Sequence, residues 1–157
     1  GQCPIYYNHP NTGRPGSRSK FTSRYLDAGF EPLYPFGYGL SYTTYSYGNM
    51  KVEETADQLI ASVDVTNTGA VEGTETVLLF MRDVTASIVR PVKELKGFSK
   101  VTLQAGETQT VTIALNKSNM GFYDDNRNYL LEDGKFQIFL GSNARDCQMT
   151  EVTVRFA

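Results

Sequence analysis

The sequence predicts an all-β protein, in which an extended, irregular N-terminal arm leads into a sandwich of about seven short antiparallel strands. Two observations support this. Eight of the ten tyrosines and five of the six prolines lie within the first 48 residues. Beyond them, short runs of β-branched and aromatic residues alternate with turn residues, and no helical period competes. We therefore expect an arm over residues 1–48 and one sandwich over residues 49–157.

The arm is expected to lack regular structure. Proline removes a backbone donor and restricts the residue before it, while glycine favours turns. Both residue types recur through residues 1–40. A regular helix or a central strand is therefore excluded there.

The first strands of the sandwich have different patterns. Residues Leu59–Thr66 alternate between apolar and mostly polar positions, which predicts one buried and one wetted face, and Asn67-Thr68-Gly69 supplies a turn. Residues Thr74–Arg82 are almost continuously apolar or β-branched. This pattern is typical of a central strand covered on both faces.

The rest of the chain continues the β pattern, with one helical turn expected within residues 116–121. About seven strands over this length indicate an immunoglobulin-like or fibronectin type III-like sandwich. Gly97 is expected to mark a bulge or bend inside its strand. The later strands are predicted over Pro91–Leu103, Thr108–Leu115, Tyr129–Leu131, Lys135–Leu140 and Val152–Phe156.

Length, charge and hydropathy exclude several classes of protein. A chain of 157 residues holds one domain with a sizeable core. Its net charge of −2 is too small to attract a phosphate backbone, so nucleic acid is not expected as a partner. The longest apolar run, Val77–Met81, is far shorter than the roughly 20 residues of a membrane span, so no membrane contact is expected either.

The ends of the chain carry little targeting information. The chain begins at Gly1 with no signal-peptide pattern, and we interpret this start as a cut in a longer protein. Cys3 and Cys147 are too few for a disulfide framework or a four-cysteine zinc site, so they are interpreted as unpaired thiols.

No catalytic constellation emerges from the acidic residues or from the single histidine. Glycoside hydrolysis needs two opposed carboxyl groups. Here Asp64 and Glu75 fall on polar strand faces, and the other candidates fall in turns, where carboxylates bond the local backbone. His9 lies in the arm without a nucleophile-elbow motif near it, so a packing role is expected. The turn carboxylates are Asp124, Asp125, Glu132 and Asp133.

A partial calcium-loop pattern also fails. Asp124, Asn126 and Asn128 match its first alternating ligand positions. Tyr129 then stands where the glycine is needed, and Lys135 where the bidentate glutamate is needed. Without a Gly-rich phosphate loop or a Cys/His cluster as well, the sequence predicts no metal site and no cofactor.

The tyrosine-rich arm is the most informative feature. Clustered tyrosines on an irregular segment usually mark a contact surface, because they bury a large area and keep a hydroxyl for hydrogen bonding. Two interpretations stay open: the arm packs against another domain, or its tyrosines stack on sugar rings.

Long strings of residues in this chain closely resemble the C-terminal region of family 3 glycoside hydrolases. In the arm these are residues 4–9 (PIYYNH), 11–15 (NTGRP) and 33–45 (LYPFGYGLSYTTY). In the sandwich, residues 65–69 (VTNTG), 73–75 (GTE) and 91–98 (PVKELKGF) resemble the fibronectin type III-like domain at the end of many of those enzymes.

The resemblance implies a non-catalytic accessory region. Relatives are retaining β-glucosidases and β-xylosidases whose catalytic carboxylates lie on two domains upstream of the matched region, so this chain inherits no catalytic residue and should be inactive alone. The upstream domains are the expected partners, with β-linked glycan as a second, and the parent is expected to be periplasmic or secreted. Outer-subsite or interdomain contacts are expected from Tyr7, His9, Arg14 and Phe36.

Overall fold

The computed structural model describes residues 6–11, 13–14, 16–17, 19, 29 and 31–156. Cys3, and with it the expectation of two unpaired thiols, lies outside these residues; Cys147 is a free thiol. Within the described part, no helix is long and apolar enough to cross a membrane.

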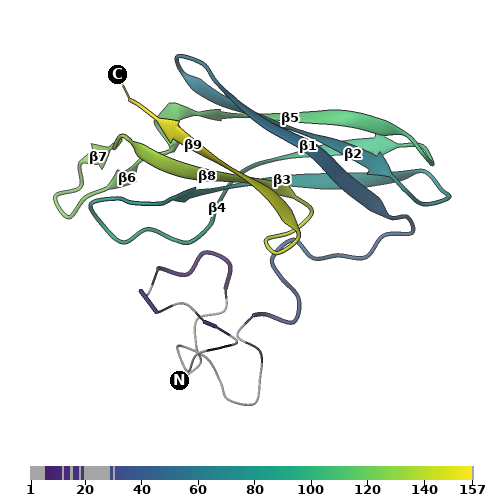
Figure 1. Cartoon of the computed structure of the whole chain (residues 1–157), viewed down its shortest axis with the longest axis horizontal. Coiled ribbons are helices and arrows are strands. Elements are labelled where there is room, and N and C mark those ends of the chain that lie inside the picture. Colours follow the sequence, from purple (N-terminus) through teal and green to yellow (C-terminus); the bar gives the residue numbers. More distant parts are fainter. Residues whose placement is uncertain are drawn as a thin grey trace.

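Two antiparallel sheets form a sandwich (Figure 1), as the sequence predicts. One sheet has the strand order β1-β2-β5 and the other β4-β3-β8-β9, and a small hairpin of β6 and β7 lies at one end. The strands are β1 Tyr45–Glu54, β2 Gln58–Asn67, β3 Gly73–Asp83, β4 Glu94–Leu103, β5 Thr108–Asn116, β6 Phe122–Tyr123, β7 Tyr129–Leu130, β8 Gly134–Gly141 and β9 Cys147–Val154. The short 3₁₀ helix η1, Lys117–Asn119, confirms the expected helical turn.

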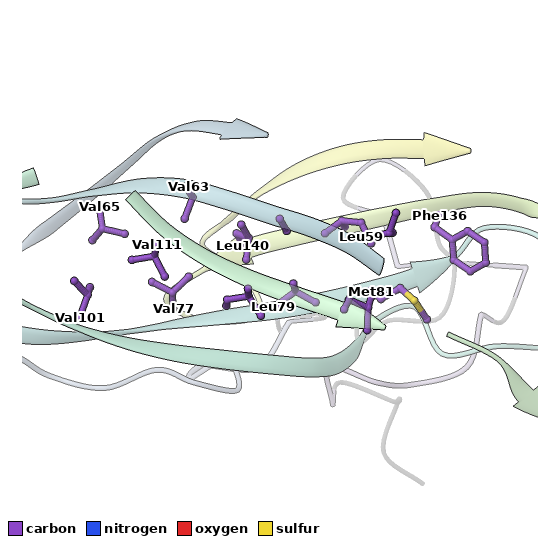
Figure 2. Close-up of a cluster of buried hydrophobic side chains, with 14 of the residues drawn as sticks. Leu59, Val63, Val65, Val77, Leu79, Met81, Val101, Val111, Phe136 and Leu140 are labelled. Atoms are coloured by element: carbon purple, nitrogen blue, oxygen red, sulfur yellow. The ribbon is translucent and has the colours of Figure 1, made fainter. Parts of the chain in front are cut away.

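The core lies between the two sheets. On β2, alternate residues from Leu59 to Val65 are buried, as their spacing predicts. They belong to one cluster with the inward side chains of β3, β5 and β8 (Figure 2). That cluster includes Val77, Leu79, Met81, Val111, Phe136, Ile138 and Leu140.

Strand β3 is covered on both faces. Residues 77–81 are all buried, which confirms the prediction of a central strand. Leu79 faces the core, whereas Leu78 and Phe80 point to the outer face of the sheet. The arm supplies the cover for that outer face, and in Figure 1 it runs along the side of the molecule where β3 and β4 lie.

Strand β1, Tyr45–Glu54, has no counterpart among the strands predicted from the sequence. In the sequence, Gly48 and Asn49 are typical of a turn at the end of the arm. In the structure they lie within β1, where the pairing with β2 shifts register between Gly48 and Lys51. Asn49 has φ +52° there. A turn-like dipeptide inside a strand is the signature of a β-bulge. The sandwich strands therefore begin at Tyr45, inside the segment assigned to the arm from composition.

Other strand limits also differ from expectation. Strand β4 begins at Glu94 and not at Pro91, and β9 begins at Cys147 and ends before Phe156. The predicted strand at Tyr129–Leu131 is only the two-residue β7. The break at Gly97 is confirmed, because the β3–β4 register shifts opposite it, between Leu79 and Phe80. Gly97 faces the core there, where an added Cβ would lie 3.1 Å from Ile113.

Candidate functional site

Two of the four predicted site residues stack on each other above the sandwich. The rings of Tyr7 and Phe36 lie 4.4 Å apart at 28°, and both meet Phe80 of β3 edge-on, at centroid distances of 5.6 and 6.3 Å. Such offset and edge-on contacts are the favoured geometries for aromatic pairs. Because Phe80 is fully buried, the stack completes the cover of the outer sheet face.

His9 anchors the arm through its backbone. Its carbonyl accepts a hydrogen bond from Val92 N at 2.9 Å, and Pro10 forms a β-bridge with Pro91. The His9 ring lies edge-on to Tyr6, with Nδ1 2.9 Å from the Pro10 carbonyl. These contacts agree with a packing role. Arg14 is exposed at the surface.

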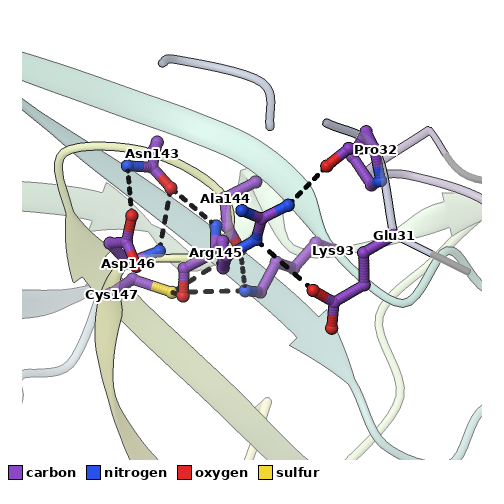
Figure 3. Close-up of polar contacts among 8 residues, drawn as sticks. All are labelled: Glu31, Pro32, Lys93, Asn143, Ala144, Arg145, Asp146 and Cys147. Carbon is purple, nitrogen blue, oxygen red and sulfur yellow. Dashed lines mark hydrogen bonds and ion pairs between the residues drawn. The ribbon is translucent and has the colours of Figure 1, made fainter. Parts of the chain in front are cut away.

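The turn between β8 and β9 holds the arm at a second place (Figure 3). Ala144 N donates to the carbonyl of Phe36 at 2.8 Å. Arg145 donates to the carbonyl of Pro32 and lies 3.4 Å from the Glu31 carboxylate. The side chain of Asn143 caps this turn by accepting from two following backbone amides, which fixes the position of the two arm contacts.

Lys93 joins the loop before β4 to the same turn. Its ammonium donates to the carbonyl of Ala144, lies 3.2 Å from Cys147 Sγ, and sits 4.3 Å from the ring centroid of Phe139 on the outer face of β8. A cation over an aromatic face is stabilised by the ring quadrupole. Sequence reasoning missed Lys93 and Arg145, since no local pattern indicates that loops more than fifty positions apart meet under the arm.

The outward surface of the arm forms what we call the arm face. Leu40 is 92% exposed and Tyr42 is fully exposed. A run of large apolar side chains that are all exposed is unusual on the surface of a monomeric protein and marks an interaction site. No charged residue occurs between Glu31 and Lys51, so none of the side chains of the arm face is charged. The arm face consists of Leu33, Tyr34, Phe36, Tyr38, Leu40 and Tyr42.

Several of the carboxylates considered from the sequence are engaged in local structure. Asp64 accepts from Thr110 Oγ1 and Asn49 Nδ2, and these two hydrogen bonds lower its pKa. Glu132 accepts from Ser87 N at 2.8 Å, and Asp133 from Phe156 N at 2.7 Å. Within the part of the chain that the structure describes, no group of three or more His, Cys, Asp or Glu side chains is arranged to hold a metal ion.

Glu75 departs from the expectation of a solvated strand face. It is half-buried, and its carboxylate accepts a hydrogen bond of 2.6 Å from the hydroxyl of Tyr47 on the opposite sheet. Burial raises the pKa of Glu75, and burial together with the bond to Glu75 raises that of Tyr47. The pair is therefore an element of the interface between the sheets.

The sandwich matches a known domain family. Residues 75–144 match the model of the fibronectin type III-like domain family. Residues 75–144 form a fibronectin type III-like domain. This domain and the arm together resemble the C-terminal part of family 3 β-glucosidases and β-xylosidases, which confirms the family recognised from the sequence.

The relatives extend the likeness over most of the chain. A periplasmic β-glucosidase of Salmonella typhimurium is 47% identical over 90% of this chain and 19% of its own length, and a β-xylosidase of Formosa agariphila is 38% identical over 99% and 22%. The crystal structure of a Listeria innocua β-glucosidase in complex with glucose superposes with a TM-score of 0.86 at 39% identity, covering 95% of this chain and 22% of that one. The chain thus spans about a fifth of the relatives' length.

Proposed function

We propose that this chain is the non-catalytic C-terminal accessory region of a family 3 glycoside hydrolase of the β-glucosidase or β-xylosidase type, an enzyme that cleaves β-glycosidic bonds with retention. The observation that carries the proposal is the arm face, an uncharged row of exposed aromatic and aliphatic side chains fixed to the sandwich at two places. The relatives support the assignment of the parent, since each is named as a β-glucosidase or β-xylosidase.

The occupant of the arm face in this proposal is the upstream catalytic part of the same polypeptide. Four fifths of the relatives' length lies outside the match, so partner domains exist in those proteins. Fully exposed side chains such as Leu40 gain hydrophobic free energy only when another surface covers them. An uncharged surface also favours an uncharged partner, because a charged group buried against it would lack a counterion.

The predicted site residues fit this arrangement as contacts and supports. Tyr7 supports the Phe36 ring of the arm face, and the backbone of His9 and Pro10 fixes the arm to the loop before β4. We propose that Arg14 and the exposed edge of Phe36 contact the upstream domains or an outer sugar subsite. The Salmonella relative is named as periplasmic, which supports a periplasmic or secreted parent.

A carbohydrate-binding role for the arm is the second candidate function. Tyr34 and Tyr38 lie 5.0 Å apart with their rings tilted by 42°, and both are exposed, as a sugar platform requires. The aliphatic Leu33 and Leu40 among them favour a protein contact instead, because they offer no ring for stacking.

Hydrolysis assays test the leading proposal. The isolated chain should release no nitrophenol from nitrophenyl β-D-glucoside or β-D-xyloside, whereas the longer protein encoded with it should hydrolyse at least one of the two. Turnover by the isolated chain, or a longer protein without glycosidase activity on either substrate, would refute the proposal.

A further inference from the structure

The end of the sandwich that carries the β6–β7 hairpin is separate from the arm face and is rigidly built. The loop of residues 84–93 and the segment that carries the hairpin are joined by the Ser87–Glu132 hydrogen bond. Beneath them, the buried guanidinium of Arg90 lies 4.9 Å from the ring centroid of Phe122 and bonds Glu94. This ion pair and cation–π contact fix the base of the hairpin.

A pair of tyrosines projects from this base. Tyr123 and Tyr129 meet edge-on with ring centroids 5.0 Å apart. The Tyr129 hydroxyl donates to Ser118 O at 2.7 Å and accepts from Gly121 N at 3.1 Å, so that ring is held in one position. Tyr123 packs against it and is itself 67% exposed. An exposed ring with a fixed orientation loses little conformational entropy when a ligand stacks on it.

The turn next to Tyr123 adds polar groups in a fixed frame. Asp124 closes the turn by accepting from Asn128 N at 2.7 Å, while its carbonyl accepts from Arg127 N, and Arg127 adopts φ +65°. The side chains of Asp125, Asn126 and Arg127 are exposed, and none forms a hydrogen bond or ion pair with any other described residue. An exposed carboxylate, amide and guanidinium thus follow the exposed ring of Tyr123 on the same turn.

We propose that Tyr123 and the side chains of residues 125–127 form a binding site for a neutral pyranose, as a unit of a β-linked oligosaccharide. A sugar offers a C–H face for the ring and hydroxyls that both donate and accept, and the free carboxylate, amide and guanidinium complement these hydroxyls. The site comprises Tyr123 and the three residues 125–127, whereas a stable protein interface takes about 20–30 residues on each side. With one free carboxylate and one free guanidinium, it provides no excess positive charge for a polyanion.

This site differs from the sugar platform considered for the arm, and the choice of β-linked oligosaccharides as its ligands rests on the proposed function of the chain. The test is a titration of the isotopically labelled 157-residue chain with cellohexaose, laminarihexaose and xylohexaose, followed by amide chemical shifts. We expect at least one of the three oligosaccharides to shift the amides of residues 122–130. Absence of shifts with all three at millimolar concentration would overturn the proposal, as would shifts confined to Tyr34, Tyr38 and Tyr42.

Variants sharpen the test. Tyr123→Ala should weaken the binding about tenfold or more, the usual effect of removing a central aromatic contact, and Tyr123→Phe should retain it. Phe98→Ala is the matched control, because Phe98 of β4 is likewise an exposed ring, 64% accessible. An unchanged affinity in Tyr123→Ala, with the spectrum showing an intact fold, would also contradict the proposed site.

Discussion

Asn67 is a fully buried amide at the end of β2 whose hydrogen bonds join the two sheets. Its Oδ1 accepts from Thr43 Oγ1 at 2.6 Å and from Gly69 N at 3.1 Å, and its Nδ2 donates to the carbonyls of Val71 and Leu103. The residue thereby satisfies four polar groups where water is excluded. Buried groups that lose such partners retain the full cost of their desolvation.

We expect Asn67→Ala to lower the free energy of unfolding by about 2–4 kcal/mol, because it leaves several buried polar groups unpaired. Urea denaturation of the isolated chain measures the change. Thr68→Ala is the control, since Thr68 is exposed and bonds only to groups at the surface, and its effect should stay below about 0.5 kcal/mol. Equal effects of the two substitutions would contradict the assigned role of Asn67.

Glu75 gives the stability of the domain a pH dependence. Its pKa is raised in the folded state by burial, so ionisation is easier in the unfolded chain. The stability associated with the protonated form is present below the unfolded pKa, about 4.3, and is lost as the pH rises through the folded pKa. Replacing Glu75 with a neutral side chain of the same size should remove this loss of stability.

Glu75→Gln should therefore flatten the fall in stability that begins as the pH rises above the unfolded pKa of glutamate, about 4.3. Partial exposure of Glu75 screens the effect, so we expect Glu75→Gln to give a small gain in stability at pH 7. Denaturation curves of both proteins at several pH values measure it. Parallel pH profiles for wild type and variant would show that Glu75 does not contribute.

The arm becomes a third layer of the molecule through a tight approach at Gly37. This residue has φ +88°, and an added Cβ would lie 2.6 Å from Leu78 Cδ1 and 3.0 Å from the carbonyl of Ser142. Gly39, two positions later, has open space around it. A side chain at Gly37 would strain the backbone and lift the arm from the outer face of β3.

Gly37→Ala is expected to destabilise the chain by about 1–3 kcal/mol and to expose Phe80, whereas Gly39→Ala should be nearly neutral. Thermal unfolding and binding of a hydrophobic dye compare the two variants. If both glycines tolerate alanine equally, the arm does not stabilise the sandwich in the way described.

At the scale of strands, local patterns predicted the core well and the arm only in part. Alternation on β2 and the continuous apolar run of β3 identified their buried faces, because strand period and burial are local properties. The run on β3 also predicted a cover for its second face. Which segment provides that cover depends on contacts between Phe36, Tyr7 and Phe80, and no local period encodes such pairing. Strand β1 was not predicted because the residues of its β-bulge, Gly48 and Asn49, are of the same types as turn residues.

For the candidate site, the family strings located the arm residues, but the roles of these residues come from tertiary contacts. The rings of Tyr7 and Phe36 stack on each other, although nothing in their two separate motifs predicted this contact. Arg145 holds the arm at Pro32, and Lys93 holds the turn that carries Arg145, yet neither residue was predicted to have a role at the site. Ion pairs and hydrogen bonds between distant loops have no sequence period, so only the structure identifies them.

The whole molecule is a sandwich with one outer face covered by its own arm and with the arm's outward surface bare. In our account the bare arm face is covered by the catalytic part of the longer protein. Leu40 is the best residue for testing this contact, because its side chain is 92% exposed here and contributes little to the stability of the isolated chain. Its contribution to stability should therefore depend on the presence of that partner.

The most direct test is the unfolding temperature of Leu40→Asp in two contexts. In the longer protein the substitution should lower the melting temperature by several degrees, because a charge is buried at the domain contact. In the isolated 157-residue chain it should change the melting temperature by about 1 °C or less, as expected for an exposed position. An equally small change in both contexts would contradict the account, since it would show that the arm face stays exposed in the complete protein.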